Sequence, residues 1–378
     1  MHSLLRNMRV YDASMGVAGP YCTSLLAQYG AEVIKVEPPG GDWGRHIGQS
    51  FDGLGAYFLT YNRGKKSVVL DLHDPVDLER ARQLMASCDV VVESFRPGVM
   101  SRLGLDYEAA RSRRENVIYL SLSGFGQQGP ARHDAAMDTA MQAFTGWMHL
   151  NRDVGGTPVL MNHISIDTLT GLYAFQSLLV AWMTREKTGK GAHVDVSLMN
   201  ASMAFLAPRL VEHIMSDGQL QDAVTPPTGV WRVSDGSVAI SIKGQGHFEI
   251  LCAALGQPQI AEDPRFGSRD LRMQNKSELY EVLAPKFLAL TLVNALEILN
   301  RAKLPAARVN SFDDLVGNAQ VVSTGVLKEQ PQPGFGAIPV VRIPGTDGEF
   351  DPGPAPALGQ DTQAIFERLA AGGKTSEG

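Results

Sequence analysis

A carboxylate, Asp167, stands at the start of a long apolar segment and is the first candidate for chemistry. Residues 169–183 are apolar on nearly every side, which predicts a buried helix that is too short to span a membrane. Aspartate is a favoured N-cap residue, and Gly189 supplies a typical C-terminal stop. Few charged residues precede Asp167, so we expect a carboxylate that is ionised at neutral pH and poorly hydrated. Such a group suits nucleophilic attack on an activated acyl carbon, and a structural cap is the alternative.

Basic side chains near the ends of predicted strands form a second group of candidates. The group comprises Arg45, Arg63, Lys65, Lys66, Arg96 and Arg102. Guanidinium and ammonium groups bind phosphate oxygens, so this set suits a ligand with several phosphates. Isolated charges on a solvated surface are the alternative explanation.

Short β-rich runs alternate with helical runs in the first part of the chain. Strands are predicted at residues 8–13, 31–37, 67–72, 89–95, 117–123 and 192–198. This alternation predicts an α/β fold with a doubly wound, parallel, Rossmann-like sheet. Ligands of such sheets bind at the carboxyl ends of the strands. The loops expected there are residues 16–20, 38–45, 95–98 and 124–130.

The composition changes after residue 215, which predicts a second domain. Residues 1–215 are assigned to the large sheet domain, in which residues 199–215 form its last helix. Residues 216–229 are predicted to be a linker, and residues 230–324 a small α+β domain that begins with a hairpin. The Pro- and Gly-rich residues 325–378 are predicted to form an extended strap and a short helix, with a disordered end at 372–378.

Composition and charge exclude several classes of protein. The 378 residues carry a formal net charge of −6, whereas a nucleic-acid-binding protein normally has a basic excess. Cys22, Cys88 and Cys252 lack the spacing of zinc ligands or of a disulfide framework, so no metal site is predicted. The N-terminus has no signal-like apolar run, and no membrane span is predicted. We therefore expect a cytoplasmic protein.

The segment from Gly124 to Gly129 has the G-x-G-x-x-G spacing of a dinucleotide-binding loop and follows a predicted strand. An amphipathic helix should come next, but Pro130-Ala-Arg-His-Asp134 follows instead. The spacing therefore does not indicate an NAD site.

Several segments together resemble the family III CoA-transferases, the CaiB/BaiF group that includes formyl-CoA transferase and the carnitine CoA-transferases. The matching segments include Val17-Ala-Gly-Pro20, Gly30-Ala-Glu-Val-Ile-Lys-Val-Glu37, Asn62-Arg-Gly-Lys-Lys-Ser67, Arg96-Pro-Gly98, Ser123-Gly-Phe-Gly-Gln-Gln-Gly-Pro130 and Arg185-Glu-Lys-Thr-Gly-Lys-Gly191. The resemblance covers almost the whole chain. It implies a transferase that moves CoA from an acyl-CoA to a carboxylic acid.

The resemblance also implies roles for individual residues. Asp167 is the expected nucleophile, which carries first an aspartyl anhydride and then an enzyme-CoA thioester. The residues expected to bind CoA or its acyl end are Val17, Ala18, Arg45, Leu70, His73, Ser94, Phe95, Arg96, Arg102 and Asp138. CoA and acyl-CoA are expected as substrates, with no permanently bound cofactor. Val17 stands where formyl-CoA transferase has a glutamine, so formate or oxalate specificity is not predicted.

The family further implies an interlocked homodimer, in which the strap returns from the small domain to the sheet domain. Two other functions stay open. An α-methylacyl-CoA racemase needs two proton-transfer groups, but the family's histidine falls at Met137, and only His133 and His163 are nearby substitutes. The second of these alternatives is a non-catalytic protein that binds CoA or another nucleotide.

Overall fold

The computed structural model describes residues 4–51, 53–153, 155–219, 222, 224–346 and 351–372. The chain divides into two compact units, one of Met1–Val211 with Val326–Gly378 and one of Glu212–Gly325. The predicted small domain, residues 230–324, lies inside the second unit. Most of the predicted disordered end, residues 373–378, lies outside the described residues.

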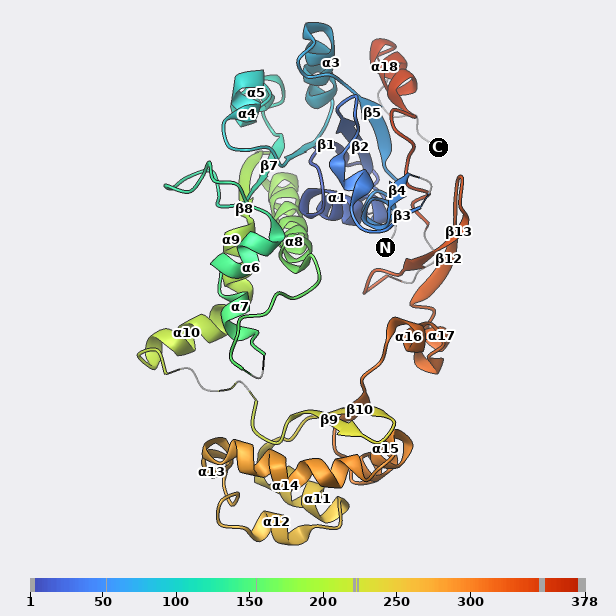
Figure 1. The fold of residues 1–378 in the computed structure, drawn as a ribbon. Helices are drawn as coiled ribbons and strands as arrows, with labels where there is room; N and C mark the ends of the chain where they lie inside the picture. The colour runs from blue at the N-terminus through green and yellow to red at the C-terminus, as the bar shows by residue number, and fades with distance from the viewer. Residues whose placement is uncertain are drawn as a thin grey trace. The chain divides into compact units, whose positions relative to one another are not determined.

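A six-stranded sheet in the order β5-β2-β1-β6-β7-β8 forms the centre of the first unit (Figure 1). Its strands are β1 (Arg9–Ala13), β2 (Glu32–Glu37), β5 (Lys66–Val69), β6 (Val90–Glu93), β7 (Ile118–Ser123) and β8 (Ala192–Ser197). Every pairing between them is parallel. The predicted parallel α/β sheet is therefore confirmed.

Successive residues of the strands face opposite cores, because side chains alternate across a sheet. On one face, Val10 and Val90 pack with helices α1 (Ala18–Gln28) and α8 (Ser165–Thr188). On the other face, Tyr11 and Val91 pack with α3 (Pro75–Ala86), α5 (Tyr107–Arg113) and α18 (Thr362–Ala370). Helices thus cover both faces of the sheet, as labelled in Figure 1.

The remaining elements of the first unit are short and lie mostly in its loops. They are η1 (Trp43–His46), β3 (Ser50–Phe51), β4 (Leu54–Gly55), α2 (Ala56–Tyr61), α4 (Val99–Leu103), α6 (Asp138–Phe144), α7 (Trp147–Leu150), α9 (Leu198–Phe205), β12 (Leu327–Gln332) and β13 (Gly336–Val341). The prediction that residues 325–378 form an extended strap before a short helix is thus partly wrong, because β12 and β13 in this segment pair as an antiparallel hairpin. The predicted helix over 199–215 is broken at Leu206 between α9 and α10 (Ala207–Met215).

The second unit has its own core around a three-stranded antiparallel sheet in the order β11-β10-β9. The strands β9 (Gly229–Val233) and β10 (Gly236–Ile240) form the predicted hairpin, and β11 (Ala306–Arg308) pairs with β10. The helices are α11 (Gly244–Ala254), α12 (Pro258–Glu262), α13 (Arg269–Gln274), α14 (Lys276–Leu288), α15 (Leu292–Arg301), α16 (Phe312–Val316) and α17 (Ala319–Thr324).

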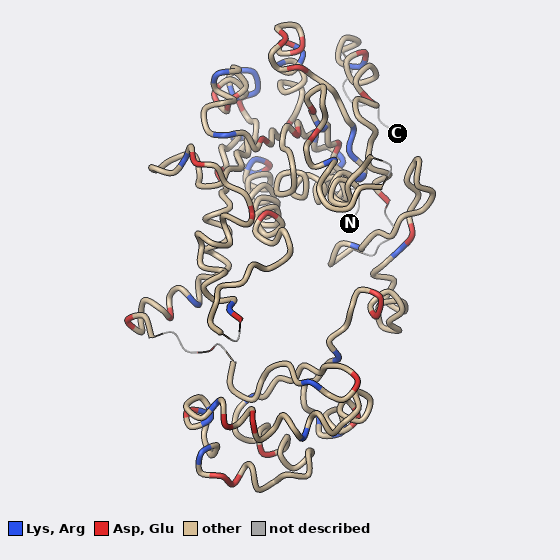
Figure 2. The backbone as a smooth tube through the Cα atoms, in the orientation of Figure 1, with Lys and Arg blue, Asp and Glu red and all other residues tan. Residues whose placement is uncertain are grey.

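Charged residues of both signs are interspersed along the backbone of each unit (Figure 2). Over the described parts of the chain, no group of three His, Cys, Asp or Glu side chains is arranged to hold a metal ion. No single helix among those residues is long and apolar enough to cross a membrane. Helices α14 and α15 together have the length and composition of a span, but the chain bends by 113° between them.

Candidate active site

Helix α8 begins three residues earlier than the sequence predicts. Its first residue is Ser165 and its N-cap is Ile164, so the prediction that Asp167 is the N-cap is wrong. The capping role belongs instead to Asp138 on α6. Its Oδ2 accepts hydrogen bonds from the backbone N–H groups of Ile166, at 2.7 Å, and Asp167, at 3.2 Å. Because Asp138 accepts these two hydrogen bonds, the Asp167 side chain is not needed to cap the helix.

The segment that leads into α8 is fastened to α6 by Gln142. Its Nε2 donates to Oδ1 of Asp138 at 2.6 Å and to the carbonyl oxygens of Met161 and His163, both at 3.2 Å. Its Oε1 accepts from the Met161 N–H at 3.1 Å. Sequence reasoning missed Gln142, although its spacing of four residues from Asp138 on one helix was a signal that the two side chains meet.

Gly171 lets α8 approach α1 closely one helical turn beyond Asp167. A Cβ atom at this position would lie 2.7 Å from the carbonyl oxygen of Ala18, which is shorter than any real contact of that kind. Asp167 therefore lies beside the N-terminus of α1, where the Ala18 N–H acts to lower the pKa of its carboxyl group. The two helices that cover one face of the sheet thus bring Asp167 to the loop after β1.

A cavity of about 410 Å³ opens in front of the Asp167 carboxylate. It lies at the carboxyl ends of the strands, because Met15, Ser94 and Ser123 follow or end β1, β6 and β7. The predicted site residues that line it are Val17, Ala18, Ser94, Asp138 and Asp167. The structure therefore gathers five of the eleven predicted residues around one cavity.

A neighbouring cavity of about 280 Å³ holds a further part of the predicted set. Leu70, His73, Phe95 and Arg102 line it. Met15 lines both cavities, so the two adjoin at that residue. Sequence reasoning missed Met15, which lies between two predicted elements and carries no chemistry of its own.

Arg96 lines neither of these cavities. It belongs to a third cavity, of about 260 Å³, together with Glu93, Ser121 and His193. The loop after β6 therefore sends Phe95 and Arg96 into different cavities.

Arg45 takes a structural position that does not support the predicted contact with phosphate. Its Nε and Nη2 each donate to the Glu37 carboxylate at 2.7 Å, and its Nη1 donates to the Pro356 carbonyl oxygen at 3.3 Å. The guanidinium also lies 3.8 Å above the centre of the Phe58 ring. Arg45 is buried and ties the end of β2 to the C-terminal segment.

The lysines and arginine just before and at the start of β5 also bond to other groups of the protein. Lys65 is buried, and its Nζ lies 3.0 Å from the Asp12 carboxylate. Lys66 pairs with Glu32 at 2.6 Å. Arg63 is buried and donates to side chains of the C-terminal segment. Of the predicted basic residues, Arg102 is thus the one that lines a cavity adjoining that of Asp167.

Neither histidine proposed for proton transfer lines the Asp167 cavity. His163 is exposed and lies 3.2 Å from the Ser165 hydroxyl, and His133 is exposed and bonds to Arg132. Met137, at the position expected for a racemase histidine, does line the cavity.

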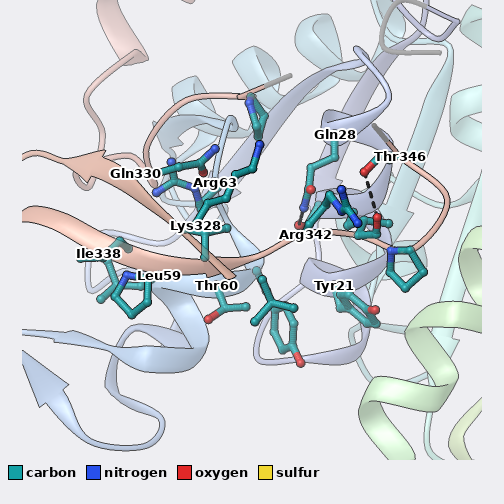
Figure 3. Close-up of a pocket in the computed structure, with 18 residues that line it drawn as sticks. Tyr21, Gln28, Leu59, Thr60, Arg63, Lys328, Gln330, Ile338, Arg342 and Thr346 are labelled. Carbon is teal, nitrogen blue, oxygen red and sulfur yellow. Dashed lines mark hydrogen bonds between the residues drawn. The ribbon is translucent and has the colours of Figure 1, made fainter. Parts of the chain in front are cut away.

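Another cavity, of about 300 Å³, lies between α1, α2 and the β12–β13 hairpin (Figure 3). Tyr21, Arg63 and Arg342 are among its lining residues, and Asp167 is not. It is therefore separate from the site built around α8.

The surroundings of Asp167 favour its protonated form. Burial, together with the negative charge of Asp138, raises the pKa of Asp167 to about 7, although the Ala18 N–H acts in the opposite direction. The residue keeps some contact with solvent through the cavity, but protein surrounds most of its carboxyl group. The expectation that Asp167 is simply ionised at neutral pH is therefore wrong, because the helix N-terminus contributes less than burial and the neighbouring acid do.

This chain is similar to known proteins over nearly its whole length. The sequence profile of CoA-transferase family III matches residues 5–362. The mouse succinyl-CoA:glutarate CoA-transferase is 32% identical, over 97% of this chain and 86% of its own length. The chain belongs to the family III CoA-transferases. Members of this family use CoA thioesters as substrates, so this protein is a transferase that acts on them.

Other relatives and solved structures agree with this assignment. The acetyl-CoA:oxalate CoA-transferase of Acetobacter aceti is 32% identical, over 96% of this chain and 95% of the relative. The probable fatty acyl-CoA transferase Rv3272 of Mycobacterium tuberculosis is 30% identical over 96% of this chain and 98% of its own. A CAIB/BAIF family protein from Brucella suis superposes with a TM-score of 0.86 at 30% identity, covering 98% of this chain and 100% of the other.

The raised pKa of Asp167 predicts a pH dependence for this CoA-transferase. A carboxylate that attacks a thioester must be ionised, so if Asp167 is the nucleophile, kcat/KM should fall roughly ten-fold for each pH unit below about pH 7. An unperturbed aspartate would instead keep full activity down to roughly pH 4. Initial rates measured from acid to neutral pH, on enzyme shown to stay folded, distinguish the two. An acid limb near the ordinary aspartate pKa would contradict the prediction.

Proposed function

We propose that the transferase moves CoA between carboxylic acids through covalent intermediates on Asp167. The observation that carries the proposal is the position of this carboxylate. It lies in a cavity at the carboxyl ends of the strands, released from helix capping by Asp138. The substrates in the relatives' names differ from one another, so those names do not select the acids that this chain uses.

The chemistry follows from a carboxylate facing a thioester. An Asp167 oxygen attacks the acyl carbon, the carbon–sulfur bond breaks, and an aspartyl anhydride and CoA thiolate form. The thiolate then attacks the aspartyl carbonyl carbon, which releases the donor acid and leaves CoA bound to Asp167 as a thioester. The acceptor carboxylate repeats these steps in reverse and leaves with CoA.

The N-terminus of α1 is the better source of donors for the oxyanions of these steps. At the start of α8, the N–H groups of Ile166 and Asp167 already donate to Asp138, so they do not serve that purpose. Ala18 and Gly19 occupy the first turn of α1 and line the cavity. The Ala18 N–H already favours charge on the Asp167 carboxyl group itself, where an oxyanion forms when the aspartyl carbonyl carbon is attacked. Both N–H groups lie at the positive end of the helix, where negative charge is favoured.

The adjoining cavity suits the rest of the CoA molecule. Leu70 and Phe95 supply apolar surface, while His73 and Arg102 supply groups for phosphate oxygens. Because this cavity meets that of Asp167 at Met15, CoA bound here can place its sulfur near the carboxylate.

A second copy of the chain is the proposed partner, as in the interlocked dimer that the resemblance implies. Leu172, Val180 and Met183 are large apolar side chains of α8 that are exposed in the single chain. Exposed apolar groups in such numbers on one helix are typical of surfaces that another protein covers. A cytoplasmic location stays a prediction.

A transfer assay tests the proposed function. Purified protein incubated with an acyl-CoA and an isotope-labelled carboxylic acid should yield labelled acyl-CoA and the free donor acid, as measured by mass spectrometry. Hydrolysis of the donor without labelled thioester would contradict the proposal. The same reaction run in heavy water with a 2-methylacyl-CoA should show no deuterium at the α-carbon, because Met137 cannot transfer a proton; uptake there would favour a racemase.

A further inference from the structure

The walls of the Asp167 cavity carry information about the acyl group. Much of the lining is apolar, and its larger side chains are Met15, Trp43, Ile47, Met137, Ile164 and Leu198. Asp138 and Asp167 are the charged residues among those that line it, and no lysine, arginine or histidine of the described chain is among them. The space beside the nucleophile is therefore apolar, and the ionisable groups that this chain contributes to it are acidic.

We infer that this enzyme transfers CoA between apolar monocarboxylic acids of short to medium length, and that Met137 contributes to this choice. The inference rests on the proposed function, since it concerns the acyl group that Asp167 would attack. It names the class of acid and a specificity-determining residue.

A second carboxylate on the acyl chain would be unfavourable in this cavity. It would lie near Asp138 and Asp167 and would lose water without gaining a cationic partner from this chain. Like charges repel one another strongly where protein replaces water, and an unpaired buried charge is costly. An alkyl chain, in contrast, gains stabilisation from every methylene group that contacts the apolar walls. Both effects favour the acid without the second charge.

Met137 is well placed to act on the acyl chain without holding the fold. It precedes α6 in an extended conformation, and its side chain is 60% exposed although it lines the cavity. The residue after Met137 is Asp138, whose carboxylate accepts a hydrogen bond from the Asp167 N–H. Met137 and Asp167 therefore both lie beside Asp138 and line the same cavity. A charge introduced at Met137 would therefore lie in the space that the acyl chain occupies.

Matched pairs of donors test the inference. Butyryl-CoA and succinyl-CoA have acyl groups of equal length, as do hexanoyl-CoA and adipoyl-CoA, and each pair differs by one terminal carboxylate. With the full-length enzyme and one common acceptor, we expect kcat/KM for the apolar member to exceed that of its partner by on the order of 100-fold. Between butyryl-CoA and hexanoyl-CoA, kcat/KM should rise roughly three- to four-fold per added methylene.

A substitution then tests the role of Met137. Met137→Lys should lower the hexanoyl-to-adipoyl ratio by about ten-fold or more, because it supplies the missing counter-charge. Met137→Leu keeps the apolar wall and should hold the ratio within about three-fold. Val293→Lys, which adds the same charge at an exposed position of α15 in the second unit, should not change the ratio.

The outcomes separate this inference from the function on which it rests. Transfer that favours succinyl-CoA and adipoyl-CoA would overturn the inference while leaving the transferase mechanism intact. An unchanged ratio in Met137→Lys, with all three variants folded, would overturn the role of Met137. Failure of every donor to give labelled product would instead contradict the proposed function.

Discussion

Replacing Asp167 by asparagine should lower kcat/KM by on the order of 10³-fold or more while CoA still binds. The amide cannot form the anhydride, so the covalent route is lost. The backbone bonds that begin α8 come from Asp138, so the helix should keep its start. Asp153→Asn, at an exposed carboxylate outside the cavity, is the matched control and should retain activity.

The same substitution should make the protein more stable in alkaline solution. The pKa of Asp167 is raised from its ordinary value to about 7, so this carboxyl group stabilises the folded state only while it is protonated. That contribution is complete below the unfolded pKa and is lost as the pH rises through about 7. At about pH 8, the free energy of unfolding of Asp167→Asn should therefore exceed that of the wild type by on the order of 1–3 kcal/mol. Urea unfolding measures this difference. A variant that is inactive and also less stable would indicate a structural role instead.

Replacing Lys65 by methionine should cost roughly 3–5 kcal/mol of unfolding free energy. The Lys65 ammonium is buried and contacts Asp12 at 3.0 Å, Thr23 at 2.7 Å and Asn62 at 2.9 Å. Its removal leaves the buried Asp12 with one cation fewer. Burial acts to raise the pKa of Asp12, but Lys65, Lys35 and hydroxyl groups outweigh it and hold the value at about 2. Asp12 therefore adds stability above its unfolded pKa, and this is lost as the pH falls towards about 2.

The next residue supplies the control for this prediction. Lys66 pairs with Glu32 in a partly exposed position, with 41% of its side chain accessible. Exposed ion pairs contribute little, so Lys66→Met should cost less than about 1 kcal/mol. Urea unfolding of both variants at neutral pH measures the difference. Equal losses would show that the buried contact between Lys65 and Asp12 adds no more stability than the exposed pair of Lys66 and Glu32.

The sheet could be predicted from the sequence because its central strands are buried and its strands alternate with helices. Residues 90–92 form a continuous apolar run, and Lys35 is the one polar residue among residues 33–36, a pattern typical of buried parallel strands. The start of α8 could not be predicted in the same way. The residue that caps it, Asp138, lies 29 positions away from Asp167, and only the fold brings the two together.

In the candidate site, too, some residues could be predicted from the sequence, while the roles of others depend on contacts that only the fold creates. Asp167 could be found, since a carboxylate at the start of a long apolar helix has few other uses, whereas Asp138 is expected at the site only from the family resemblance. The role of Arg45 could not, because its guanidinium is taken by Glu37 from β2 and by the Pro356 carbonyl oxygen, more than 300 residues further along the chain. A basic residue near a predicted binding loop has the same sequence signal whether it meets a phosphate or a buried acid.

Trapping the enzyme after reaction with an acyl-CoA alone tests the central claim most directly. Hydroxylamine attacks anhydrides and thioesters, so the account predicts a hydroxamate at Asp167, found by peptide mass after digestion. The adduct should require the donor and should be missing from Asp167→Asn. A hydroxamate mapped to another residue, or full activity without any adduct at Asp167, would contradict the account.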